Sequence, residues 1–301
     1  MAENQAVTEN QTPNQNQTLW EKLSHGQRAV AVELDPPTDE NAVPFMEDAR
    51  VLYEAGADVI TIADCPMGRP RIDSCLLACK IKREIGAEVL PHMACRDRNW
   101  TAIQAMLMGL SMEEIRQVLF VTGDPIPAEY REQSRVVFHF NSRELTRRVM
   151  ELQGTLSQPP FRIFGALNVN ARYFDRQLQA AREKEACGMV GFLTQPVLSR
   201  AALNNLKRAR ETLHGKLLGG IFPVISYRNA AFLNEHVPGI RVSEEILSMY
   251  EGKDREEGEQ LALELALKTA RDIEPWTDGL YLMTPFRRVS LMSAILDGLS
   301  Q

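Results

Sequence analysis

Short apolar runs alternate with amphipathic segments from Ala29 to the end of the chain. The apolar runs predict strands at 29–34, 58–63, 88–93, 117–122, 162–168, 189–194, 217–225 and 279–283. The helical periodicity between them predicts helices at 41–55, 74–85, 99–116, 142–153, 173–187, 199–213, 228–236 with 243–272, and 287–298. Gly56, Gly86 and Gly188 stand where a helix is expected to end just before a strand.

This alternation predicts an α/β fold, a single (β/α)8 TIM barrel. Parallel strands need crossover helices, and eight such pairs can close into a barrel. The alternative is an open doubly wound sheet, which is weakened because no G-x-G-x-x-G turn follows the first strand. We expect two parts: a disordered polar tail over 1–18, rich in Asn and Gln, and the barrel over 19–301. Leu19, Trp20 and Leu23 predict a short helix that covers one end of the barrel.

Composition excludes several function classes. The net charge is −6 and the basic residues form no block, which argues against nucleic acid as a partner. No apolar run reaches the roughly 20 residues that span a bilayer, and no signal-peptide pattern opens the chain, so we expect a cytoplasmic protein without a membrane partner. The five cysteines are dispersed, which favours reduced thiols and no metal site. We expect a homo-oligomer, since barrel helices offer surfaces that can pair.

Polar side chains stand at the carboxyl ends of the predicted strands, where barrels bind their ligands. The strand ending in Val121-Thr122 is stopped by Gly123-Asp124-Pro125, which places a carboxylate at this edge. The alternative for Asp124 is a turn-forming residue before proline. The other ends carry Glu33, Asp64, His92, Asn168, Gln195 and Arg287.

Glu33 is the strongest candidate for a catalytic residue. Its apolar neighbours in Val30-Ala31-Val32-Glu33-Leu34 should raise its pKa toward the range of a general acid, although an exposed rim carboxylate remains the alternative. His92 fits either a ligand contact or a core histidine. Gln195 offers the donor and acceptor that a heterocyclic amide edge needs, or it simply closes a strand. From its position on a predicted helix, Lys184 is interpreted as a lysine whose side chain extends into solvent.

Several motifs in order resemble the methylenetetrahydrofolate reductases, from about Val30 to the C-terminus. They are Val32-Glu33-Leu34-Asp35-Pro36-Pro37, Pro91-His92-Met93-Ala94-Cys95-Arg96-Asp97-Arg98-Asn99, Val121-Thr122-Gly123-Asp124-Pro125, Gly165-Ala166-Leu167-Asn168, Leu193-Thr194-Gln195-Pro196 and Leu282-Met283-Thr284-Pro285-Phe286. Each motif is weak alone, and together they are specific. The likeness is greatest to the branch often fused behind a homocysteine methyltransferase domain.

The resemblance implies a flavoprotein that reduces 5,10-methylenetetrahydrofolate to 5-methyltetrahydrofolate, with FAD as cofactor and NADH or NADPH as electron donor. It implies that Glu33 is the general acid and that Asp124 binds the pterin and faces the developing positive charge. It also implies that Gln195 binds the pterin, Tyr227 stacks on folate or nicotinamide, and Arg287 contacts folate.

For the flavin, the resemblance implies contacts from Ala63, Asp64, His92, Thr122, Gly123, Asn168 and Lys184. Two departures leave FMN open: the better-studied bacterial branch has an aromatic residue in place of Asn168 and an arginine in place of Glu183. A flavin- and folate-binding subunit that receives electrons from a partner protein is the alternative function. A flavin-free folate methyltransferase barrel fits the architecture but not the motifs.

Overall fold

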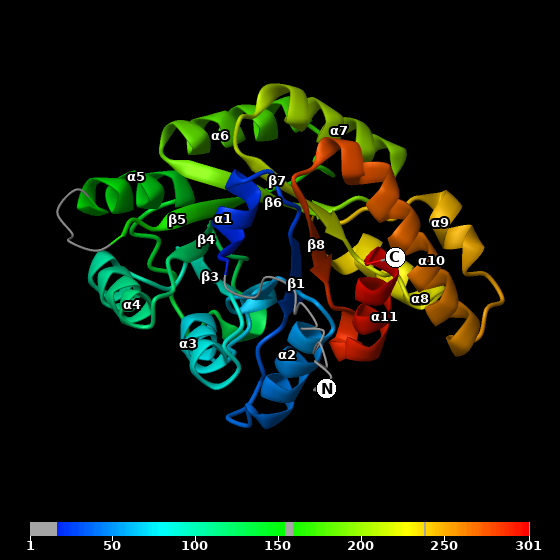
Figure 1. Cartoon of the computed structure of the whole chain (residues 1–301), viewed down its shortest axis with the longest axis horizontal. Coiled ribbons are helices and arrows are strands. Elements are labelled where there is room, and N and C mark those ends of the chain that lie inside the picture. Colours follow the sequence, from blue (N-terminus) through cyan, green and yellow to red (C-terminus); the bar gives the residue numbers. More distant parts are fainter. Residues whose placement is uncertain (1–16, 154–158, 238, 301) are drawn as a thin grey trace, which may run out of the picture.

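The computed structural model describes residues 17–153, 159–237 and 239–300, and residues 1–16 of the tail predicted over 1–18 lie outside them. The strands form one closed parallel barrel in chain order, with β1 paired to β8 (Figure 1). The predicted (β/α)8 barrel is therefore confirmed. The strands are β1 Val30–Leu34, β2 Val59–Ile62, β3 Val89–Ala94, β4 Gln117–Val121, β5 Arg162–Leu167, β6 Met189–Pro196, β7 Lys216–Ile221 and β8 Gly279–Met283.

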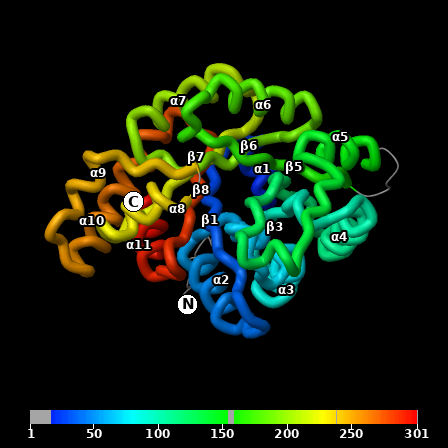
Figure 2. Tube along the Cα trace, turned by 180° about the vertical axis from the view of Figure 1, so that it is seen from behind, coloured from blue at the N-terminus to red at the C-terminus, as the bar shows by residue number. Residues whose placement is uncertain are grey.

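Helices surround the barrel on all sides (Figure 2). They are α1 Leu19–Ser24, α2 Val43–Glu54, α3 Ser74–Glu84, α4 Trp100–Met112, α5 Ser142–Gln153, α6 Phe174–Ala186, α7 Arg200–Thr212, α8 Tyr227–His236, α9 Glu244–Met249, α10 Arg255–Ile273 and α11 Val289–Leu299. Short 3-10 turns lie at η1 Pro66–Gly68, η2 Ala128–Tyr130, η3 Glu274–Trp276 and η4 Pro285–Arg287.

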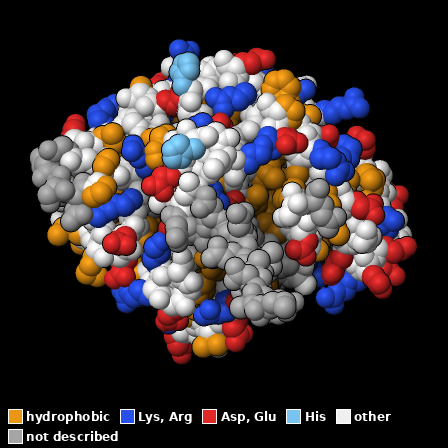
Figure 3. All heavy atoms as spheres, in the orientation of Figure 1, with side chains coloured by type: hydrophobic (Ala, Val, Ile, Leu, Met, Phe, Trp, Pro, Cys, Tyr) orange, Lys and Arg blue, Asp and Glu red, His pale blue; other side chains and the backbone are white. Residues whose placement is uncertain are grey.

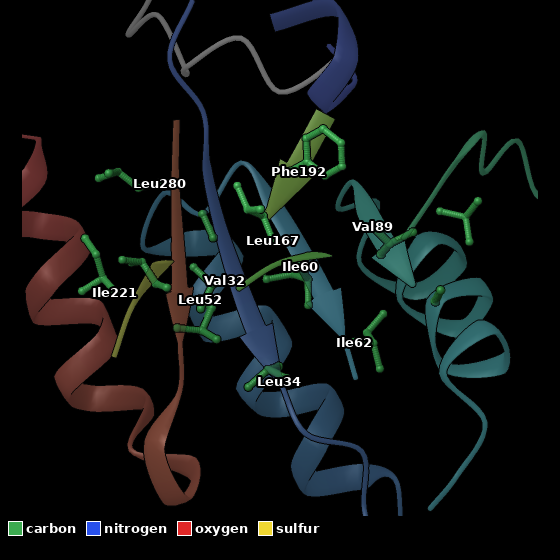
Figure 4. Packing of buried hydrophobic residues seen from close by; sticks show 14 of the residues in the cluster. Val32, Leu34, Leu52, Ile60, Ile62, Val89, Leu167, Phe192, Ile221 and Leu280 are labelled. Atoms are coloured by element: carbon green, nitrogen blue, oxygen red, sulfur yellow. The ribbon is translucent and has the colours of Figure 1, made fainter. Parts of the chain in front are cut away.

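Side-chain alternation along each strand separates an outer core from an inner one. In β1, Val32 and Leu34 face the helices and join the larger cluster drawn in Figure 4. Ala31, by contrast, belongs to the smaller cluster that fills the barrel. Glu33 is two positions further along the strand, so the same alternation turns its side chain into the barrel near the carboxyl end.

Helix α1 closes the end of the barrel where the strands begin. Leu19 and Leu23 are fully buried and join the inner cluster of the barrel. The Trp20 amide donates to Gln117 Oε1 at the start of β4 over 2.8 Å, and Lys22 pairs with Asp58 just before β2. The short covering helix predicted from the sequence is thus present.

Three predicted elements differ from the structure. The helix predicted over 99–116 ends at Met112. The helical segment predicted over 243–272 is two helices, because Gly252 adopts φ +71° and Asp254 begins α10 with a capping box to Glu257. The strand predicted over 217–225 ends at Ile221. Beyond it, Ser226 caps α8 and Asn229 Oδ1 accepts from the Ile225 amide over 3.2 Å, which commits that stretch to a loop.

Candidate active site

Three inward-facing side chains meet near the carboxyl ends of β1, β3 and β8. The phenol of Tyr281 donates a hydrogen bond to Glu33 Oε2, and His92 Nε2 lies 3.7 Å from the same oxygen. In register, Ala31 pairs with Tyr281, so Tyr281 starts one layer below Glu33 and reaches up to it. The barrel closure therefore joins residues that are far apart in sequence.

Glu33 is held in its neutral form near pH 7. Its side chain is 19% exposed. Burial raises its pKa to about 8, and the nearby Asp35 carboxylate acts in the same direction. The hydrogen bond from Tyr281 acts the opposite way but does not offset burial. A carboxyl that keeps its proton at neutral pH can donate it to a substrate.

His92 is a buried neutral imidazole. Burial lowers its pKa to about 4, so the ring carries no charge at pH 7. Its Nε2 has no hydrogen-bond partner within the described ranges, while its main-chain oxygen accepts from Ser74 Oγ over 2.6 Å. A buried ring nitrogen without a partner is costly unless a ligand satisfies it, which favours the ligand interpretation over the core one.

Asp124 lies on the exposed loop after β4 and is held from two sides. Its Oδ2 accepts from the Met67 amide over 2.7 Å, and its main-chain oxygen accepts from the buried Arg96 over 2.7 Å. Gly123 has φ +97°, and a Cβ there would lie 2.9 Å from Arg96 Cβ. The loops after β2, β3 and β4 thus fix the Asp124 carboxylate at the barrel mouth.

Asn168, just after β5, and Gln195, near the end of β6, both lie beside Gly239. A Cβ placed on Gly239 would lie 3.2 Å from Asn168 Nδ2 and 3.7 Å from Gln195 Cδ. Asn168 Oδ1 accepts from the Asn170 amide over 2.9 Å, which fixes its orientation. Two amide side chains and a residue without a side chain therefore form one polar patch at the mouth.

The residues predicted for the flavin at the carboxyl ends of β2, β3 and β4 are not equally free to contact a ligand. Ala63 is buried and Thr122 is exposed. The Asp64 carboxylate is 2% exposed, pairs with Arg98 and accepts from the Ala94 amide over 2.8 Å. Arg98 also pairs with Asp73 over 2.7 Å. The carboxylate of Asp64 is thus occupied by protein groups, and the predicted contact of Asp64 with the flavin stays a prediction.

Lys184 on α6 turns inward instead of extending into solvent. Its Nζ donates to the main-chain oxygen of Ala166 in β5 over 2.9 Å. Burial, followed by the nearby Arg143, lowers its pKa. The local interpretation of a solvated helical lysine is therefore wrong, while the contact of Lys184 with the flavin stays a prediction.

Tyr227 and Arg287 lie at the exposed rim. Tyr227 begins α8 and is 49% exposed. Arg287 donates to Asp48 of α2 from Nε and Nη2, over 2.8 and 2.6 Å. It has φ +56° and follows Phe286, which has φ +48° and is 68% exposed. Positive φ at two successive non-glycine residues is strained, and such strain gathers at binding sites.

Tyr281 is the functional candidate that sequence reasoning missed. Its run Gly279-Leu280-Tyr281-Leu282-Met283 is an ordinary buried strand. The available signal was the alternation that turns Tyr281 inward beside the first strand.

Neither membrane nor metal features stand out in the described residues. No helix among them combines the length and apolarity needed to cross a bilayer. They also hold no group of three His, Cys, Asp or Glu side chains arranged for a metal ion. On the face seen in Figure 3, Lys and Arg side chains are interspersed with Asp and Glu, which gives no continuous basic surface there.

Comparisons with solved structures show the same barrel fold. An uncharacterized protein from Clostridium thermocellum that binds two copies of 5-methyl-5,6,7,8-tetrahydrofolic acid superposes with a TM-score of 0.63 at 11% identity, covering 93% of this chain and 97% of that one. A ligand-free form of tryptophan synthase from M. tuberculosis gives a TM-score of 0.50 at 12% identity, covering 92% and 95%. None of the curated proteins matches the chain.

A family comparison covers nearly the whole barrel. The family described as methylenetetrahydrofolate reductase matches residues 18–299. This range contains all the strands that form the closed barrel and every residue discussed at its mouth. The chain therefore belongs to the methylenetetrahydrofolate reductase family.

Proposed function

We propose that the chain is a flavin-dependent oxidoreductase that reduces 5,10-methylenetetrahydrofolate to 5-methyltetrahydrofolate. Family membership over residues 18–299 supports a folate enzyme of this kind. The C. thermocellum protein, which has the same fold, binds the expected product. The observation that carries the proposal is the neutral carboxyl of Glu33 at the barrel mouth.

Glu33 is proposed to protonate the folate N10. Protonation lets the bond between N10 and the methylene carbon break, which opens the five-membered ring and leaves a cationic iminium at N5. A general acid works best when its pKa lies near the working pH, and the pKa of Glu33, about 8, meets this condition.

Asp124 and the two amides are proposed to orient and stabilise the folate. The iminium is positive, and the Asp124 carboxylate, already held by the Met67 amide, is a fixed negative group at the same mouth. Gln195 offers a donor and an acceptor to the pterin edge. Tyr227 and Arg287 are proposed to meet the rest of the folate at the rim.

The mouth has groups that fit a flavin. His92 Nε2 is a buried polar atom that needs a partner. Gly123, whose missing side chain lets it pack against Arg96 and Ala94, is proposed to contact the flavin through its main chain. Ala63, Asp64, Thr122, Asn168 and Lys184 are proposed to complete the site. FAD is the proposed cofactor, with FMN as the alternative, and NADH or NADPH is the proposed donor. When bound, the flavin supplies the hydride that converts the methylene carbon to a methyl group.

The test separates the two half-reactions in the purified protein. We expect a bound flavin that NADH or NADPH reduces and that methylenetetrahydrofolate reoxidises, followed anaerobically by stopped-flow absorbance. Glu33→Gln should slow reoxidation by about 100-fold or more, since general acid catalysis is typically worth 10²–10⁴, and should leave flavin reduction within about two-fold. Glu40→Gln, which changes an exposed carboxylate on the loop between β1 and α2, is the control and should change neither half-reaction.

Two outcomes would overturn the proposal. A protein that binds no added flavin would remove the cofactor, and equal loss of both half-reactions in Glu33→Gln would remove the assigned role of Glu33. Turnover that requires an added protein donor in place of NADH and NADPH would instead identify the chain as an electron-accepting subunit.

A further inference from the structure

Tyr281 is the one side chain in the described ranges that donates a hydrogen bond to Glu33. The phenol lies on β8, is 6% exposed and donates to Glu33 Oε2. His92 Nε2 approaches the same oxygen at 3.7 Å, which is too long for a hydrogen bond. A glutamate side chain has several rotatable bonds, so a single directional contact decides where its carboxyl group points.

We infer that Tyr281 is a positioning residue, which orients the Glu33 carboxyl so that Oε1 presents the transferable proton to the folate. The inference rests on the proposed function. Oε2 already accepts the hydrogen bond from the phenol, and Oε1 has no hydrogen-bond partner within the described residues. In the neutral acid the proton therefore belongs on Oε1, the oxygen left for the substrate.

The pKa of Glu33 depends on the groups around it, so a titration of Glu33 can detect its hydrogen bond with Tyr281. Asp35 raises the pKa of Glu33 and faces Arg71, which partly offsets the charge of Asp35. His92 on β3 is neutral at pH 7. Tyr281 lowers the pKa of Glu33, because its hydrogen bond favours the ionised carboxylate. Loss of the hydroxyl should therefore move the titration of Glu33 to higher pH.

Burial and the nearby carboxylate of Glu33 raise the pKa of Tyr281 well above its usual range. The phenol therefore keeps its proton across the working pH range, and it acts as a donor without exchanging its own proton. This behaviour distinguishes a positioning residue from a second acid.

The test is Tyr281→Phe in the flavin-loaded protein. We expect reoxidation by methylenetetrahydrofolate to slow by about 10- to 100-fold, since a misplaced catalytic group typically costs this much. Flavin reduction should stay within about two-fold. The alkaline limb of the pH profile for reoxidation should move to higher pH. Tyr250→Phe is the matched control, because its buried hydroxyl donates to the main-chain oxygen of Val224 away from Glu33, and it should leave the limb unmoved.

A second readout needs no turnover. Infrared difference spectra between the wild-type protein and Glu33→Gln, with labelled glutamate, follow the Glu33 carboxyl directly as pH is varied. A higher midpoint in Tyr281→Phe supports the inference, and an unchanged midpoint overturns it. If the wild-type flavin is not reoxidised by methylenetetrahydrofolate, the proposed function fails, while the infrared titration still decides whether Tyr281 controls Glu33.

Discussion

At the scale of single residues, Glu33 makes stability depend on pH. Its pKa is about 8 in the folded chain against 4.5 for an ordinary glutamate. The folded state thus prefers the neutral form, so the stabilisation is complete below pH 4.5 and is lost as pH rises toward 8. Glu33→Gln should therefore gain stability relative to wild type over this window, by on the order of a few kcal/mol at pH 8.

Urea unfolding at pH 5 and at pH 8 checks this expectation. The difference between Glu33→Gln and the wild-type protein should be small at pH 5 and larger at pH 8. Glu40→Gln, which changes an exposed carboxylate, should show the same small difference at both values. An equal effect of Glu33→Gln at both values would contradict the raised pKa.

Glu33 was predictable and Tyr281 was not, for a physical reason. The apolar residues on both sides of Glu33 predict a desolvated carboxyl from local sequence alone. The contact with Tyr281 joins positions 248 residues apart, and it exists because the last strand pairs with the first. Likewise, the inward turn of Lys184 depends on the packing of α6 against β5, which helical periodicity does not specify.

At the scale of elements, the loops after β2 and β4 act as one unit. Gly68 has φ +69°, and a Cβ there would lie 2.4 Å from the main-chain oxygen of Pro125, next to Asp124. Gly68→Ala should therefore displace the Asp124 loop and slow flavin reoxidation by folate by about 10-fold or more, since small misplacements at a site are costly.

Gly56→Ala is the control that distinguishes the clash caused by Gly68→Ala from the backbone strain of an alanine with positive φ. Gly56 also has a positive φ, +99°, but a Cβ there meets nothing within 4 Å. It should cost about 1–3 kcal/mol of stability from strain and leave reoxidation unchanged. Urea unfolding and stopped-flow absorbance on both variants make the comparison, and equal reoxidation rates in the two would contradict the coupling of the loops.

Elements were largely predictable because apolar periodicity marks their centres, whereas their ends depend on caps and turns. The division of the segment 243–272 illustrates this. Its overall periodicity is helical, yet the left-handed turn at Gly252 and the capping box of Asp254 interrupt it. The turn and the capping box each involve only a few residues. They are hard to recognise in the sequence, because they lie within or beside the charged run from Lys253 to Glu259.

At the scale of the whole molecule, α1 completes the inner core. Leu23 is fully buried among side chains that point into the barrel. Leu23→Ala should cost about 2–5 kcal/mol, the usual range for removing a buried leucine side chain. Met112→Ala on α4 is the control, because Met112 is 74% exposed and should change stability by less than about 0.5 kcal/mol. Urea unfolding measures both, and similar values would show that α1 does not seal the barrel.

Because α1 closes one end of the barrel, it also limits how reactants can enter. With Leu19 and Leu23 filling one end, a molecule that reaches Glu33 has to come through the opposite opening. In the proposed reaction, folate and dinucleotide would then have to enter through the same opening at different times. Each would compete with the other when present in excess. The short helix α1, at the opposite end of the barrel from Glu33, would in this way make the two reactants bind alternately.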